Sequence, residues 1–333
     1  MNKNKLLLNP GPTNTIKEVK DAQTTWSDVC HRTDEFLYLL NETKRKLLKR
    51  FDSQASFDDW NVTIMGGSGT IALESLISSL LRGVTIINAG KYGQRAIDIA
   101  KTYNIGFHEV CCSNIDDLAH NDDIKSLYFV ENETTTGETF KLSKIIDLYP
   151  NARLYIDATS AFGASDYSNS IDKIDAISFC SNKCLQSTPG LGIVIWRKEL
   201  EVYPRTHYSN LNRYVSNDDI PFTVPTQSVA ALSVALDYSN SGDQFNHRRD
   251  RIIKDLKNMG IECINSHPSN SIIGFKHPNR TYDSLKEFLL DRGIVIYSGI
   301  PDIKNSFRIA TMSSRFDKDY SIIVEAFHDS CIR

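Results

Sequence analysis

Short apolar segments alternate with longer amphipathic segments along the first two thirds of this 333-residue chain. The apolar segments have the length of buried strands, and the amphipathic ones place apolar residues three and four positions apart, as a helix face requires. Strands are predicted at 61–65, 84–88, 126–130, 153–156, 176–180 and 192–196, and helices at 34–51, 70–81, 95–103, 142–149 and 226–238. Apolar strands separated by helices indicate an α/β fold with a mostly parallel sheet that is covered on both faces.

The pattern changes after a polar, loop-like stretch at 203–219. From there the predicted order is helix 245–259, strand 271–275, helix 282–292, strands 295–297 and 306–310, and helix 317–327. This order predicts a second, smaller α+β unit. A chain of this length accommodates about two domains, so we expect a large domain over 14–240 and a small C-terminal domain over 241–333, preceded by a segment of residues 1–13.

Charge and composition narrow the class of protein. The net charge of −3 argues against binding to nucleic acid or an anionic membrane, which normally needs a basic surplus. The chain has no apolar run long enough to cross a bilayer. The leucines near the start end at Asn9 and Pro10, too soon for a signal peptide. Seven scattered cysteines fit no zinc-site spacing, so we expect reduced thiols, a cytoplasmic location and no metal.

Two polar residues follow predicted strands, at the edge where parallel sheets bind ligands. Asp157 comes directly after strand 153–156, and Lys183 follows strand 176–180. A desolvated lysine amine forms Schiff bases, and a carboxylate can keep a pyridine nitrogen protonated. This order of groups is the layout of a pyridoxal phosphate (PLP) site. Taken singly, Asp157 is also consistent with a helix cap and Lys183 with a solvated surface residue.

Three further features extend this hypothesis. The run Gly66-Gly67-Ser68-Gly69-Thr70 opens a helix, where backbone N–H groups attract phosphate; a simple turn with a helix cap is the alternative. Tyr92 follows strand 84–88 and can stack on a cofactor ring, or can pack as an ordinary core tyrosine. Arg308 lies in an apolar strand, where it needs an anionic partner if it is buried; an edge strand facing water is the alternative.

In this order along the chain, the segments resemble class V aminotransferases of PLP fold type I, the aspartate aminotransferase-like fold. Among these, the branch that uses 2-aminoethylphosphonate and pyruvate is the most similar. The segments are 6–13 (LLLNPGPT), 67–70 (GSGT), 92–95 (YGQR), 133–137 (ETTTG), 157–163 (DATSAFG), 181–186 (SNKCLQ), 222–226 (FTVPT) and 307–309 (FRI). The resemblance covers nearly the whole chain and places the segment 1–13 near the active site.

The resemblance implies a role for each matching position. Lys183 would form the Schiff base with PLP and carry the proton, and Asp157 would pair with the pyridine nitrogen. Ser68, Gly69 and Thr70 would hold the cofactor phosphate.

The other cofactor-binding roles fall to Tyr92, Thr135, Thr159, Thr223 and Thr226. Tyr92 would stack on the ring, Thr135 would lie near its phenolic oxygen, and Thr159 would lie beneath it. Thr223 and Thr226 would reach the phosphate of a partner subunit, which implies a homodimer with active sites at the interface.

The activity implied by the resemblance is transfer of an amino group from 2-aminoethylphosphonate, or a related small phosphonate or phosphate amine, to pyruvate. The products would be phosphonoacetaldehyde and alanine, and Arg308 would grip the substrate carboxylate. The alternatives are an alanine–glyoxylate or serine–pyruvate type of aminotransferase, or one acting on a small phosphorylated amine. A cysteine desulfurase-like lyase is disfavoured, because no cysteine lies between Cys263 and Cys331.

A phosphonate needs cations beyond Arg308, and the sequence offers Arg32, Arg205, His207 and Arg213. Three departures from the family pattern bear on the amino donor. Glu131 stands where relatives usually have histidine, Ala310 stands where they usually have glycine, and the stretch 203–220 is shorter than usual and is expected near the substrate mouth.

Overall fold

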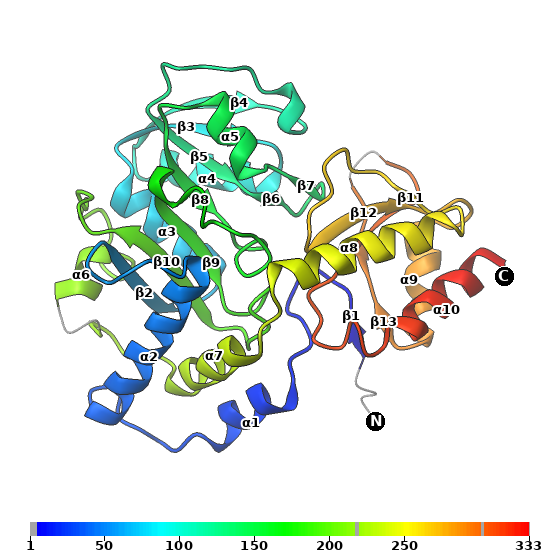
Figure 1. Ribbon diagram of the computed structural model, residues 1–333, viewed down its shortest axis with the longest axis horizontal. Helices are drawn as coiled ribbons and strands as arrows, with labels where there is room; N and C mark the ends of the chain where they lie inside the picture. Colours follow the sequence, from blue (N-terminus) through cyan, green and yellow to red (C-terminus); the bar gives the residue numbers. More distant parts are fainter. Residues whose placement is uncertain (1–4, 217–219, 301–302, 333) are drawn as a thin grey trace.

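The computed structural model describes residues 5–216, 220–300 and 303–332. Its centre is a seven-stranded sheet (Figure 1). The strands, in spatial order, are β2 (Trp60–Gly66), β10 (Leu191–Arg197), β9 (Ile174–Cys180), β8 (Arg153–Asp157), β5 (Ser126–Val130), β3 (Gly83–Asn88) and β4 (Gly106–Cys111). Only β10 is antiparallel to its neighbours, β2 and β9. The predicted mostly parallel sheet is confirmed.

Helices cover both faces of this sheet. α3 (Gly69–Leu80) and α4 (Lys91–Thr102) pack on one face, and α2 (Asp34–Phe51), α5 (Leu142–Leu148) and α7 (Thr226–Tyr238) pack on the other. Successive strand side chains point to opposite faces, so in β5 Tyr128 and Val130 meet the first layer while Phe129 meets the second. The site described below lies on the α3/α4 side, at the carboxyl ends of the parallel strands.

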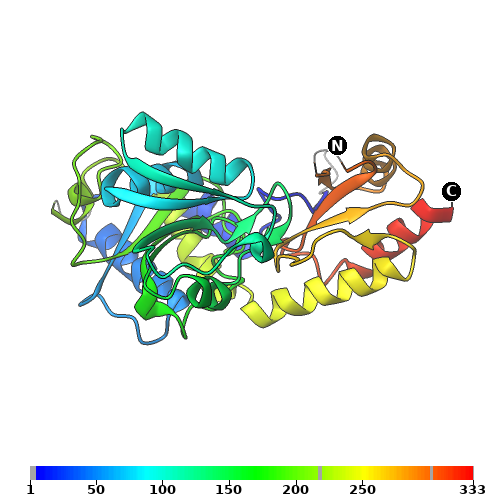
Figure 2. The ribbon, with the colours of Figure 1, turned by 90° about the horizontal axis from the view of Figure 1, so that it is seen from above.

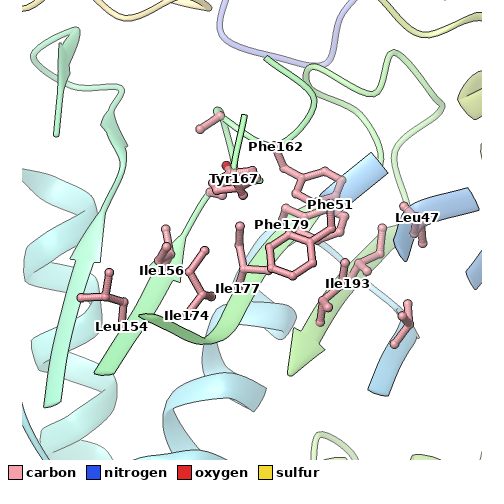
Figure 3. Close-up of a cluster of buried hydrophobic side chains, with 14 of the residues drawn as sticks. Leu47, Phe51, Leu154, Ile156, Phe162, Tyr167, Ile174, Ile177, Phe179 and Ile193 are labelled. Atoms are coloured by element: carbon pink, nitrogen blue, oxygen red, sulfur yellow. The ribbon is translucent and has the colours of Figure 1, made fainter. Parts of the chain in front are cut away.

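The α2 side of the sheet holds the largest cluster of buried side chains. Figure 3 shows Phe51 of α2 beside Phe179 and Ile177 of β9 and Ile193 of β10. Phe162 stacks on Phe179 with a centroid distance of 3.6 Å. Burying a side chain of this size contributes about 1.5–3 kcal/mol. The cluster therefore holds β9 and its neighbours rigidly, and with them the groups at their carboxyl ends.

A second sheet forms a separate lobe (Figures 1 and 2). Its order is β11 (Glu262–Cys263), β12 (Ile272–Lys276), β15 (Ser306–Ala310) and β14 (Tyr297–Ser298), all antiparallel. The helices α8 (Gly242–Lys257), α9 (Tyr282–Asp291) and α10 (Tyr320–Ile332) belong to this lobe. The predicted domain boundary at 240/241 falls between α7 and α8 and stays a prediction.

The N-terminal segment joins the two lobes. β1 (Leu6–Leu7) pairs in parallel with β13 (Ile294–Val295) of the smaller lobe, and the Leu8 carbonyl accepts a hydrogen bond from Ala310 N at 2.7 Å. The chain then crosses to the larger lobe, where α1 (Lys17–Thr25) lies beside α7 (Figure 1). Residues near the start of the chain therefore pack against its last strands.

Several short elements were not predicted. They are β1, α1, β4, β11, α6 (Leu211–Ser216), the hairpin β6 (Asn132–Glu133) with β7 (Glu138–Thr139), and the 3₁₀ turns Ile115–Asp117 and Ile171–Lys173. The exposed edge strand β4 has no apolar run to reveal it. The single strand predicted at 295–297 is wrong, because β13 pairs with β1 while β14 pairs with β15. Across the described ranges, none of the helices combines the length and apolar character needed to span a bilayer.

Candidate active site

Most of the predicted cofactor residues, but not Thr135, Thr223 or Thr226, line one cavity of about 160 Å³ at the carboxyl edge of the central sheet. It is lined by Ser68, Gly69, Thr70, Leu73, Tyr92, Arg95, Asp157, Thr159, Cys180, Asn182 and Lys183. A second space of about 230 Å³, the mouth cavity, opens on the other side of Lys183. The mouth cavity is lined by Pro10, Gly11, Lys91, Tyr92, Arg95, Thr134, Thr135, Lys183, Tyr297, Ser298 and Arg308. Lys183, Tyr92 and Arg95 border both spaces.

Lys183 is held in a tight turn that follows β9. Its carbonyl accepts a hydrogen bond from Gln186 N at 2.9 Å, and its ammonium donates to the carbonyl of Pro10. Gly11 has φ +130°, and a Cβ there would lie 2.8 Å from Cδ of Lys183. Glycine is therefore required at position 11, both for its backbone conformation and for the approach of the lysine. The N-terminal segment thus shapes the path of the Lys183 side chain.

Asp157 is the last residue of β8 and is 2% exposed. Burial raises the pKa of its carboxyl, while the hydrogen bonds from Thr159 lower it; the backbone N–H of Thr159 donates to Oδ1 at 2.9 Å. A buried carboxylate is stable only beside a cation or strong donors. A protonated pyridine nitrogen in the adjoining cavity would supply that partner.

The opposite end of this cavity is the N-terminus of α3. Ser68 caps the helix, with its hydroxyl accepting from Thr70 N at 3.3 Å. The Thr70 hydroxyl accepts from Nη1 of Arg95 at 3.2 Å. The unpaired N–H groups of a first helical turn, hydroxyls and a nearby guanidinium are the donor set that binds a phosphate. Arg95 was not singled out from the sequence.

A buried carboxylate, Glu133, positions Tyr92. One oxygen of Glu133 accepts from the backbone N–H groups of Tyr92 at 3.1 Å and Gly93 at 3.4 Å, at the start of α4. The other accepts from Thr135 N at 3.1 Å and from the Thr135 hydroxyl. A Cβ at Gly90 would lie 2.6 Å from the Thr135 hydroxyl, so only glycine permits this approach. Glu133 was missed because its partners on α4 lie about forty residues away in sequence.

Thr135 lies at the mouth and not beside Asp157. Its hydroxyl donates to Glu133 and accepts from Lys91 N at 3.3 Å, so both its hydrogen-bonding functions are engaged. Its neighbour Thr134 lines a small recess together with Asn132, Asp157 and Thr159. The expected place of Thr135 near the phenolic oxygen of a cofactor ring stays a prediction.

Arg308 is 5% exposed and lies on β15, across the mouth cavity from Lys183. Its guanidinium donates to the carbonyls of Ser298, at 2.6 Å, and Thr134, and to the Ser298 hydroxyl at 3.3 Å. No carboxylate within the described ranges forms an ion pair with it. Burial lowers the pKa of Arg308. A buried cation whose partners are all neutral is suited to an anionic ligand.

Comparison with known proteins shows the family to which this chain belongs. The sequence pattern of the family Aminotransferase class-V matches residues 95–301. A 2-aminoethylphosphonate–pyruvate transaminase of Phocaeicola vulgatus is 30% identical, covering 96% of this chain and 97% of that protein. Another of that name, from Klebsiella pneumoniae, is 27% identical with 98% of each chain covered. The chain belongs to the class V aminotransferase family. It is therefore an aminotransferase, of a family that depends on PLP.

Solved structures agree on the fold of this class V aminotransferase. An aspartate aminotransferase from Thermus thermophilus superposes with a TM-score of 0.87 at 22% identity, covering 98% of this chain and 99% of that one. A phosphoserine aminotransferase from Cytophaga hutchinsonii gives a TM-score of 0.82 at 16% identity, with 99% of each chain covered. At these identities the likeness establishes the fold alone, and it confirms the predicted PLP fold type I.

Of the four cations expected to meet a phosphonate, none lines the cavities around Lys183 in the described residues. Arg32 is exposed between α1 and α2. Arg213 is half-buried on α6, and the His207 ring packs near Phe222 at 5.7 Å. Arg205 donates to the carbonyls of Ser78 at 2.7 Å and Leu81 at 2.8 Å. The sequence-based assignment of these residues is not supported by their positions in this chain.

Arg205 instead caps the C-terminus of α3, whose last carbonyls have no partner within the helix. Arg205→Ala is expected to lower the free energy of unfolding by about 1–3 kcal/mol, as for a lost charged hydrogen bond. The KM for the amino donor should stay unchanged. Thermal denaturation and steady-state kinetics would measure both, and the exposed Arg32→Ala is the matched control, expected to change stability by less than about 0.5 kcal/mol. A raised donor KM with normal stability would contradict this role.

Two departures from the family pattern also do not line the cavities around Lys183 in the described residues. Glu131 is buried on the α2 side of the sheet, where it accepts a hydrogen bond from the Tyr167 hydroxyl at 2.6 Å, and burial raises its pKa. The described part of the stretch 203–220 runs along α3, with Tyr203 N donating to the Ser79 carbonyl at 2.7 Å. Residues 217–219 lie outside the described residues. Neither Glu131 nor 203–216 borders Lys183 in this chain.

The residues expected to serve a partner subunit lie at and beside the surface of this chain. Thr223 is exposed, and Thr226 is buried at the start of α7 with its hydroxyl donating to Gln227 at 3.1 Å. Pro225, between them, lies next to Gly66, where a Cβ would meet the proline ring at 3.2 Å. The segment is therefore close to the phosphate-loop end of the cavity in its own chain, and its service to a partner stays a prediction.

Proposed function

We propose that this class V aminotransferase uses PLP to move the amino group of 2-aminoethylphosphonate to pyruvate, giving phosphonoacetaldehyde and alanine. The observation that carries the proposal is the end-to-end similarity, at 27–30% identity, to several proteins named 2-aminoethylphosphonate–pyruvate transaminase. The site supports it independently, because a lysine amine lies between a buried carboxylate and a buried arginine that forms no ion pair with a described acidic residue.

The described residues fit PLP at both ends of the cavity. Ser68, Gly69 and Thr70 would hold its phosphate at the N-terminus of α3, and Tyr92 would lie against its ring. Asp157 would accept a hydrogen bond from the protonated pyridine nitrogen, which relieves the burial of its charge. Thr159 would lie beneath the ring beside Asp157. When bound, PLP supplies an electron sink for the carbon that loses its proton.

Lys183 would form the covalent link to the cofactor and, once released, move the proton. Its ammonium borders both the cofactor cavity and the mouth cavity, so it can reach a substrate carbon between them. A lysine accepts a proton only as the neutral amine, so Lys183 would act as the base in that form. The Pro10 carbonyl orients this amine on the substrate side.

Arg308 would bind the carboxylate of the oxo acid. Its fork already bonds to the carbonyls of Ser298 and Thr134, which fixes the plane of the guanidinium before a ligand arrives. A preorganised fork loses little conformational freedom when it binds a carboxylate at two points. The anionic groups of the amino donor and of the oxo acid would thus bind at the same site in successive stages, as a two-stage transamination requires.

The assembly we propose is a homodimer with its active sites at the subunit interface. Thr223 and Thr226 would approach the cofactor phosphate of the partner. The exposure of Thr223 in the single chain leaves it available for this contact.

A donor panel tests the proposed activity. The purified protein, loaded with PLP, would be mixed separately with 2-aminoethylphosphonate, alanine, serine and a phosphorylated small amine. Conversion of the cofactor to pyridoxamine phosphate is followed by near-ultraviolet and visible absorbance. Conversion by 2-aminoethylphosphonate and by alanine is the expected result. Conversion by alanine alone would exclude the phosphonate, and conversion by the phosphorylated amine but not the phosphonate would indicate the alternative donor.

A further inference from the structure

The mouth cavity is strongly basic. Lys91, Arg95, Lys183 and Arg308 all line it, and none of the described aspartates and glutamates does. Two of these cations already have roles, since Lys183 lies at the reacting carbon and Arg95 bonds to Thr70 at the phosphate end. The charges left for the far end of a substrate are those of Arg308 and Lys91.

Lys91 is exposed, and within the described ranges its ammonium forms no hydrogen bond and no ion pair. It borders the mouth cavity and an adjoining cavity of about 300 Å³, and Arg308 borders both of these as well. The two cations therefore face the same space, one from the large lobe and one from β15.

The position of Lys91 is unfavourable for the helix itself. It is the first residue of α4, where the helix dipole is positive and a lysine typically costs about 0.3–1 kcal/mol. The Glu133 carboxylate already caps this helix from below, through the N–H groups of Tyr92 and Gly93. Lys91 is thus a cation at an unfavourable helix position, its ammonium has no partner among the described residues, and it lies at the rim of a binding cavity. This combination points to a functional role.

We infer that Lys91 is a specificity-determining residue that, together with Arg308, holds the terminal PO₃²⁻ group of the amino donor. This inference rests on the proposed function and names the residue that separates its two substrates. A carboxylate carries one charge and two oxygens, which the fork of Arg308 satisfies alone. A phosphate group carries about −1.5 to −2 charges and three acceptor oxygens at neutral pH. A phosphonate group has the same three oxygens and more negative charge than a carboxylate, so either group uses a second cation.

The test compares two unreactive anions on the PLP-loaded enzyme. Ethylphosphonate and propionate carry the two head groups but no amine, so binding is measured without turnover, by calorimetry. Lys91→Gln is expected to raise the Kd of ethylphosphonate about 5–10-fold, equivalent to about 1–1.4 kcal/mol, and to leave the Kd of propionate within about twofold. Lys91→Arg should restore ethylphosphonate binding. Lys101→Gln, on the last turn of the same helix, is the matched control and should change neither.

Kinetics then separate this inference from the proposed function. If the wild type uses 2-aminoethylphosphonate but Lys91→Gln binds ethylphosphonate normally, the inference is overturned and the proposed function stands. An equal loss of affinity for ethylphosphonate and propionate in Lys91→Gln also overturns it, since Lys91 would then only attract anions of any kind by its charge. If the wild type does not use 2-aminoethylphosphonate while ethylphosphonate binding still depends on Lys91, the inference holds for another donor. Turnover of aminoethyl phosphate would then show that this donor is a phosphate ester.

Discussion

Lys183→Ala is expected to lower the transamination rate by about 10⁴-fold, the upper range for loss of a positioned acid–base group. The variant also loses the amine that would link to PLP, so the cofactor should dissociate on dialysis, whereas the wild type retains it. The physical reason is geometric, because Lys183 is the only amine that borders both described cavities. Single-turnover absorbance with 2-aminoethylphosphonate would measure the rate.

A charge-matched variant separates proton transfer from electrostatics. Lys183→Arg keeps a cation in the site, but its guanidinium cannot be deprotonated at working pH. It should therefore be as inactive as Lys183→Ala. Rates within tenfold of the wild type for either variant would contradict the proposed role, provided that circular dichroism shows the fold to be intact.

Asp157→Asn is expected to lower the rate by about 10²–10³-fold, the scale observed when one preorganised electrostatic group is removed. The amide cannot hold the pyridine nitrogen in its protonated, electron-accepting form. The same substitution should raise the thermal stability of the cofactor-free protein, because it removes a carboxyl group whose charged form is disfavoured by burial. Activity and stability should thus move in opposite directions.

The sign of the pH dependence follows from burial. The folded-state pKa of Asp157 is raised above its ordinary value of 3.8, so the folded protein holds this proton more tightly than the unfolded chain. The stability that the neutral carboxyl contributes is full below 3.8 and is lost as the pH rises through the raised pKa. Cofactor-free wild type should show this loss in thermal denaturation, and Asp157→Asn should lack it. A parallel loss in both proteins would assign it to another group.

The sequence predicted long elements better than short ones, for identifiable reasons. The strand 126–130 and the helices 34–51 and 226–238 match β5, α2 and α7 in their bounds, because each carries an uninterrupted apolar pattern. The two-residue strand β1 depends on β13, almost at the other end of the chain, and no local pattern shows that pairing. The pairing of strands that are far apart in sequence is set by the packing of the whole molecule, so local sequence does not predict it.

In the candidate site, too, some residues could be predicted from local sequence and others could not. Asp157 and Lys183 were predicted together because both follow strands that end at one edge of the sheet. The sequence offered Arg32, Arg205, His207 and Arg213 as further cations for a phosphonate. None of them lines the cavities around Lys183 among the described residues, and Arg205 bonds to the last carbonyls of α3, whereas Lys91 borders the mouth cavity. A charged residue in a loop gives no local sign of whether it caps a helix or faces a ligand. The role of Glu133 likewise could not be recognised from the sequence, because it depends on the packing of the start of α4 against β6, the short strand that carries Glu133.

The pairing of β1 with β13 has a consequence for how the protein is made. Pro10 and Gly11, which line the mouth cavity, are translated well before the strands that anchor them, β13 and β15. The phosphate loop, Asp157 and Lys183 belong to a sheet that is complete at β10, well before Arg308 exists. Because domains fold as units during synthesis, the cofactor end of the site can form on the nascent chain, and the substrate end closes only after β13, β14 and β15 have been made.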